Sequence, residues 1–126
     1  MEKYFDNKIY KTYPKLGYGT CPLGGITLMG KQNIGMGPQS LNLSKKCLIH
    51  AYDKGIRFYD TADIYGNGKV EKLLGKVFSK KKDISICTKF GNRVKGNKII
   101  FDSSVNYFTN SLNLSLKRLK REYIDI

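Results

Sequence analysis

The chain of 126 residues has no tryptophan, one histidine and three cysteines. The cysteines, Cys21, Cys47 and Cys87, are widely spaced and form no Cys-x-x-Cys pair, so we expect reduced, mostly buried thiols. With His50 as the single histidine, this composition argues against a metal site.

Long apolar runs are also missing. No run of about eighteen apolar residues occurs, which excludes a membrane-spanning helix. Residues 1–6 contain no apolar signal core, which favours a cytoplasmic location. A hydrophobic fraction of 40% with 26% charged residues is typical of a globular protein, and the length suits one domain with a modest core.

Acidic residues are few, at 10 against 23 lysines and arginines, for a net charge of +13. Such an excess can indicate nucleic-acid binding, but it is nearly all lysine, and arginine suits bidentate recognition better. We therefore interpret it as a generic basic surface that would also attract an anionic cofactor. The basic clusters at 80–82 and 117–121 are predicted to complement the carboxyl ends of helices.

Hydrophobic periodicity predicts alternating strands and helices. Strands are predicted at 15–20, 56–59, 84–88 and 123–126, glycine-bearing loops at 21–39 and 90–101, and an arm or hairpin at 1–14. The predicted helices carry apolar stripes at helical spacing. The stripes are Leu43, Cys47, Leu48, Ala51 and Tyr52 in the first helix, Val70, Leu73, Leu74, Val77 and Phe78 in the second, and Val105, Phe108, Leu112, Leu116 and Leu119 in the third.

Capping residues fix the ends of these helices. Ser40 or Ser44 is expected to begin the first helix and Gly55 to end it, and 102–104 offers caps for the third. Strands alternating with helices predict a parallel sheet with right-handed crossovers. The fold class is therefore α/β, a partial (β/α)8 barrel of about four parallel strands and three helices spanning 15–126.

Polar side chains follow two of these strands. Asp60 ends the second strand, Tyr65 lies in the loop after it, and Lys89 ends the third. Adjacent parallel strands end on the same rim, so the three can converge, and an ammonium beside a phenol makes it a usable general acid. A structural reading stays open: Asp60 capping the loop, Tyr65 packing over the rim and Lys89 solvated.

A dinucleotide fingerprint is not supported. The run from Gly17 to Pro22 begins with the right glycines but has proline where the third glycine belongs, and no phosphate loop occurs.

The sequence resembles the aldo-keto reductase family. The resemblance is carried by Phe-Tyr-Asp-Thr-Ala-Asp-Ile-Tyr-Gly at 58–66, Glu-Lys-Leu-Leu-Gly at 71–75, Leu-Gly-Tyr-Gly-Thr at 16–20, Pro-Leu-Gly-Gly at 22–25, Ile-Cys-Thr-Lys-Phe-Gly at 86–91, and the segment from Ser111 to Ile126. It implies a barrel oxidoreductase that reduces aldehyde or ketone carbonyls with NADPH or NADH, without metal or flavin.

The resemblance also implies roles for individual residues. Tyr65 matches the proton donor, Lys89 the lysine that tunes it, and Asp60 the aspartate that pairs with the lysine near the nicotinamide ribose. Gly19 and Thr20 match the backbone beside the nicotinamide.

One departure from the family is expected to matter. The family has a catalytic histidine shortly after the fourth strand, and this sequence ends before it at Ile126; His50, on the first helix, cannot replace it. Most of the cofactor site is missing as well. We therefore expect a truncated chain that is inactive alone or depends on another chain completing the barrel. The alternatives are a non-catalytic half-barrel remnant and a protein-binding module.

Overall fold

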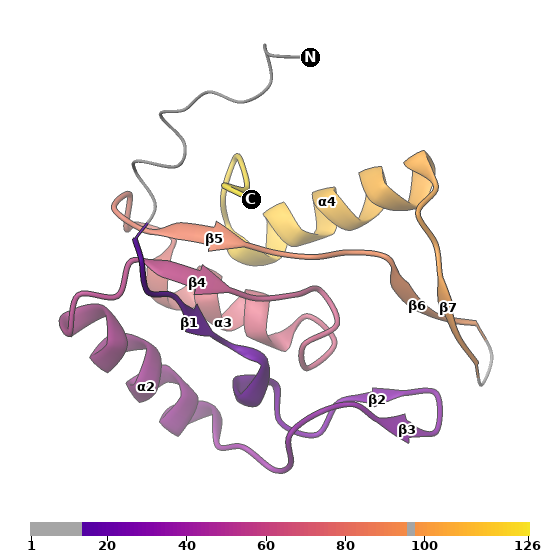
Figure 1. The fold of residues 1–126 in the computed structure, drawn as a ribbon, viewed down its shortest axis with the longest axis horizontal. Coiled ribbons are helices and arrows are strands. Elements are labelled where there is room, and N and C mark those ends of the chain that lie inside the picture. Colours follow the sequence, from indigo (N-terminus) through magenta and orange to yellow (C-terminus); the bar gives the residue numbers. More distant parts are fainter. Residues whose placement is uncertain (1–13, 96–97) are drawn as a thin grey trace.

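The computed structural model describes residues 14–95 and 98–126 (Figure 1). The predicted arm at 1–14 lies outside the described residues except for Pro14. The strands are β1 (Tyr18–Gly19), β2 (Leu28–Met29), β3 (Gln32–Asn33), β4 (Phe58–Asp60), β5 (Ser85–Cys87), β6 (Asn92–Lys95) and β7 (Lys98–Phe101). The helices are the 3-10 helix η2 (Cys21–Gly24) and the α-helices α2 (Leu41–Asp53), α3 (Lys69–Phe78) and α4 (Val105–Leu119).

A parallel sheet in the order β1-β4-β5 forms the centre of the molecule. Gly19 pairs with Asp60, and Asp60 pairs with Cys87, so the carboxyl ends of the three strands are level. The residue after each strand is a threonine. The amides of Thr20 and Thr61 each donate to the carbonyl of the neighbouring strand, at 2.9 and 2.8 Å.

The segment predicted as a fourth strand, 123–126, is not a strand in the structure. It nevertheless reaches the edge of β5. The amide of Ile126 donates to Ile86 O at 3.3 Å, and the amide of Thr88 donates to Ile126 O at 3.1 Å. This pair of bonds is the pattern of a single parallel rung opposite Cys87.

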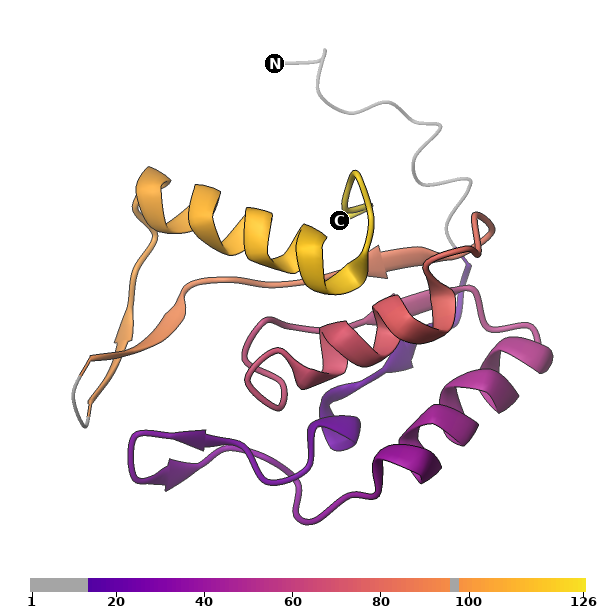
Figure 2. The same ribbon diagram turned by 180° about the vertical axis from the view of Figure 1, so that it is seen from behind.

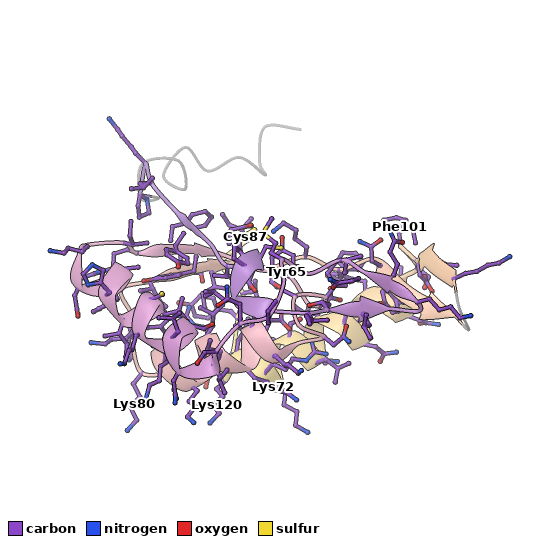
Figure 3. All side chains as sticks on the ribbon, turned by 90° about the horizontal axis from the view of Figure 1, so that it is seen from below. Tyr65, Lys72, Lys80, Cys87, Phe101 and Lys120 are labelled. Atoms are coloured by element: carbon purple, nitrogen blue, oxygen red, sulfur yellow. The ribbon has the colours of Figure 1, made fainter. Side chains whose placement is uncertain are left out.

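The three α-helices lie on one face of the sheet, as the front and back views show (Figures 1 and 2). Between sheet and helices lies the core, in which the Tyr59 and Phe78 rings are 4.8 Å apart between centroids. The core residues are Leu48, Tyr59, Val70, Leu73, Leu74, Phe78, Ile84, Ile86 and Leu119. Within the described residues the opposite face of the sheet carries no helix (Figure 3). This is the predicted partial (β/α)8 arrangement.

Both predicted long loops contain regular structure. Residues 21–39 include η2 and the antiparallel pair β2 and β3, and residues 90–101 include the antiparallel hairpin of β6 and β7. The helix starts were predicted well: the Ser40 and Ser104 hydroxyls accept from the amides of Leu43 and Tyr107.

The predicted apolar stripe of α4 is wrong in part. Val105 is 77% exposed and Phe108 is 42% exposed, whereas Ser111, Ser115 and Leu119 are buried. At its carboxyl end α4 packs closely on α3, since a side chain at Gly75 would collide with the backbone carbonyl of Arg118. In the first predicted stripe Leu43 is likewise exposed.

No helix in the described part of the chain combines the length and the apolar content needed to cross a membrane.

Candidate active site

Asp60 and Lys89 meet at the carboxyl edge of the sheet. Lys89 Nζ donates to Asp60 Oδ1 at 2.6 Å and to the Thr61 carbonyl at 2.9 Å. Burial lowers the pKa of the Lys89 ammonium, but the hydrogen bond and charge of Asp60, with smaller contributions from Tyr65 and Cys87, outweigh it and raise that pKa above its ordinary value. Lys89 is therefore held as a cation.

Tyr65 lies beside this ion pair. Lys89 Nζ is 5.5 Å from the centroid of the Tyr65 ring, which is half-buried and packs against the core. The next residue, Gly66, has φ of +59°, and its amide donates to Thr27 Oγ1 at 2.9 Å. A glycine is needed there because other residues rarely adopt this backbone conformation. The segment around Thr27 thus fixes the loop that carries Tyr65.

A cavity of about 250 Å³ opens next to the Tyr65 ring. It is lined by Cys21, Thr27, Ile34, Gly35, Ile64, Tyr65 and Asn92. Figure 3 shows Tyr65 and Cys87 on the side of the molecule opposite the one from which Lys72, Lys80 and Lys120 project. Tyr65 thus lines a cavity and lies on the side of the sheet that bears no α-helix.

Gly19 and Thr20 lie next to Asp60 but differ in burial and in the space around them. Thr20 is fully buried, and both its amide and its hydroxyl donate to Asp60 O, at 2.9 and 2.8 Å. It therefore anchors the Asp60 backbone. A side chain added at Gly19 would meet nothing within 4 Å, so open space lies in front of this residue.

Cys87 also faces the ion pair. Burial is the main cause that raises the pKa of its thiol, the charge of Asp60 raises it further, and the charge of Lys89 opposes the shift. The Cys87 side chain is partly buried, as are those of Cys21 and Cys47, and all three are free thiols. Among residues 14–95 and 98–126, no three histidine, cysteine, aspartate or glutamate side chains form a group that could hold a metal ion.

Sequence reasoning missed three residues behind the site: Glu71, Thr88 and Arg118. Glu71 is fully buried and bonded to the other two. A signal for it was present, because at 100° per residue Glu71 falls beside Phe78 on the apolar face of its helix. Arg118, predicted to complement a helix end, instead pairs with this carboxylate.

The sequence matches the family model described as "Aldo/keto reductase family" over residues 15–126. An aldo-keto reductase of Schizosaccharomyces pombe, whose name specifies NADP(+), is 34% identical over 89% of this chain and 34% of its own length. The L-galactose dehydrogenase of Arabidopsis thaliana is 31% identical over 88% of this chain and 32% of its own length.

Among solved structures, the holo form of an aldo-keto reductase from Bacillus halodurans superposes with a TM-score of 0.70 at 29% identity, over 87% of this chain and 33% of that one. The chain thus spans about a third of the length of the curated relatives it matches.

Proposed function

The chain belongs to the aldo/keto reductase family, and we propose that it supplies the proton-donor side of an NAD(P)H-dependent reduction of aldehyde or ketone carbonyls. The contact set of Asp60, Lys89 and Tyr65 carries this proposal. The chain spans about a third of the length of its relatives. The rest of the barrel and most of the cofactor site would therefore come from additional polypeptide, either in a longer form of this chain or in a second chain.

The proposed chemistry assigns one task to each residue. Tyr65 donates its phenolic proton to the carbonyl oxygen, and the Lys89 ammonium stabilises the phenolate that remains. Asp60 keeps Lys89 charged and directed along the rim. When bound, NADPH or NADH supplies the hydride that reaches the carbonyl carbon, so the products are an alcohol and the oxidised nucleotide.

The residues present fit such a cofactor. Open space in front of Gly19 adjoins the Asp60 carboxylate, which can accept a hydrogen bond from a ribose hydroxyl. The cavity beside Tyr65 then offers room for an apolar carbonyl compound.

A chimera tests the proposal. Residues 15–126 would replace the corresponding segment of the Bacillus halodurans reductase, and NADPH oxidation would be followed with benzaldehyde and with acetone. We expect turnover that Tyr65→Phe and Lys89→Met each lower by about 10²–10⁴-fold, the usual contribution of general acid catalysis. Tyr123→Phe is the matched control, since Tyr123 is 63% exposed and lies outside the site. Equal rates for the Tyr65 and Tyr123 variants would refute the assignment.

A second candidate, a non-catalytic protein-binding module, is favoured by the exposed apolar side chains Phe101, Val105 and Phe108 around the start of α4. It predicts no saturable change in nicotinamide fluorescence with the chain or the chimera. It also predicts polypeptide binding that survives both Tyr65→Phe and Lys89→Met.

A further inference from the structure

A fully buried carboxylate lies directly behind the Lys89 site. Glu71, in the first turn of α3, accepts a hydrogen bond from the Thr88 hydroxyl at Oε1 and one from Arg118 Nη1 at Oε2, both 2.7 Å long. A buried charge is costly unless it is paired and hydrogen-bonded. Here each oxygen has a partner, and the amino end of α3 adds a favourable field.

The two partners come from different elements, so Glu71 joins α3 to the end of β5 and to α4. Arg118, on the last turn of α4, reaches the carboxylate across Gly68, where an added Cβ would lie 2.6 Å from Arg118 Nε. Gly68 has φ of +79°, which also favours glycine. Glycine at position 68 therefore leaves the space that the Arg118 side chain occupies on its way to Glu71.

Thr88 is the link from this carboxylate to the site. It directly precedes Lys89, and side chains alternate between the faces of an extended chain. Thr88 thus points back toward Glu71, while Lys89 points to the rim. The backbone of Thr88 and Lys89 is also hydrogen-bonded: the Thr88 amide donates to Ile126 O at 3.1 Å, and the Lys89 carbonyl accepts from the Asp63 amide at 3.3 Å.

We propose that Glu71, held by Arg118, is a positioning residue that fixes Thr88 and thereby keeps the Lys89 ammonium on Asp60 and beside Tyr65. The inference rests on the proposed function for its catalytic meaning. The position of Lys89 is measurable without turnover, so the two claims can fail separately.

The test compares Thr88→Val with Thr88→Ser in the 126-residue chain. Valine has the shape of threonine without the hydroxyl, whereas serine retains it. The readout is hydrogen exchange of the Lys89 ammonium, followed by ¹⁵N NMR near pH 6 and assigned by its disappearance in Lys89→Met. We expect exchange at least about tenfold faster in Thr88→Val, as when a charge-assisted hydrogen bond is lost, and close to wild type in Thr88→Ser.

Leu48→Ala serves as a control for general destabilisation, because Leu48 is a buried core residue on α2 and contacts neither Thr88 nor Glu71 through a hydrogen bond. It should lower Tm while leaving Lys89 exchange unchanged. If Thr88→Val does not fold, Thr88→Ala carries the same expectation. Wild-type exchange at Lys89 in folded variants that lack the Thr88–Glu71 bond would overturn the proposal. Faster exchange together with an inactive chimera would refute the proposed function alone.

Discussion

Asp63 lies between β4 and Tyr65, and the charge of Glu71 acts on its carboxyl. Burial is the main cause that raises the pKa of its carboxyl to about 6, the Glu71 charge raises it further, and the Ile64 amide and Arg118 oppose the shift. The folded chain therefore keeps this proton up to about pH 6, whereas the unfolded chain releases it near 3.8. Since the folded state binds more protons in this window, its stability falls as pH rises through it.

Asp63→Asn removes this titration. At pH 7 we expect the variant to be more stable than the wild type by up to about 2–3 kcal/mol, because a neutral amide avoids the buried charge next to Glu71. At pH 4 the gain should be close to zero, since the wild-type carboxyl is then protonated. Urea unfolding at pH 4, 5, 6 and 7 measures the difference. A gain that does not change with pH would contradict the assignment of the raised pKa.

At the scale of elements, the contact between α3 and α4 depends on Gly75. We expect Gly75→Ala to lower the free energy of unfolding by about 1–3 kcal/mol, because the methyl group would collide with the Arg118 carbonyl and overpack the interface. Gly19→Ala is the matched control: its added methyl meets nothing within 4 Å, so stability should stay within about 0.5 kcal/mol. Chemical denaturation of both variants checks this. Equal losses would show that the close approach at Gly75 does not matter.

The three strands of the parallel sheet and the three α-helices could be predicted because each depends on local pattern. The α3 stripe is confirmed, with Val70, Leu73, Leu74 and Phe78 all buried. The buried face of α4 could not be predicted in this way, because Ser111 and Ser115 are buried there while the apolar Val105 and Phe108 are exposed. Hydrophobic periodicity identifies the most apolar face of a helix, but it carries no information about packing against the neighbouring helix.

The contact between Asp60 and Lys89 could also be predicted. Adjacent strands of a parallel sheet end on the same rim, which predicts that Asp60 and Lys89 lie close together, and in the structure Lys89 Nζ is 2.6 Å from Asp60 Oδ1. The partners of Glu71 were not predictable, because Thr88 and Arg118 lie 17 and 47 residues away, and no local pattern links them to it. The hairpin of β6 and β7 was read as a loop for a related reason: its pairing is not a periodic feature of either strand.

At the scale of the whole molecule, a net charge of +13 coexists with exposed apolar side chains. Lys72, Lys80 and Lys120 project from one side of the molecule, and Phe101 and Cys87 lie on the other (Figure 3). Phe101 is 71% exposed and Val105 77%. Mutual repulsion between chains thus opposes an association that the apolar surface favours.

Added salt should shift this balance. At about 10 mM ionic strength the Debye length is about 30 Å and repulsion keeps chains apart, whereas at 1 M it is about 3 Å. We expect the sedimentation coefficient to rise between these limits at a fixed chain concentration, and Phe101→Ser with Val105→Ser to suppress the rise. Sedimentation velocity measures both. A coefficient independent of salt would mean that these side chains do not drive association.

The hydrogen bond from the Thr88 amide to Ile126 O offers a probe of how the edge of the sheet opens. The Thr88 amide donates a hydrogen bond to Ile126 O. Its exchange with deuterated solvent therefore reports the detachment of residues 124–126 from β5. The amides of Thr61 and Thr20 make the equivalent hydrogen bonds one and two strands further from that edge. Comparing the exchange rates of the three amides would show whether the sheet frays from that edge or opens cooperatively.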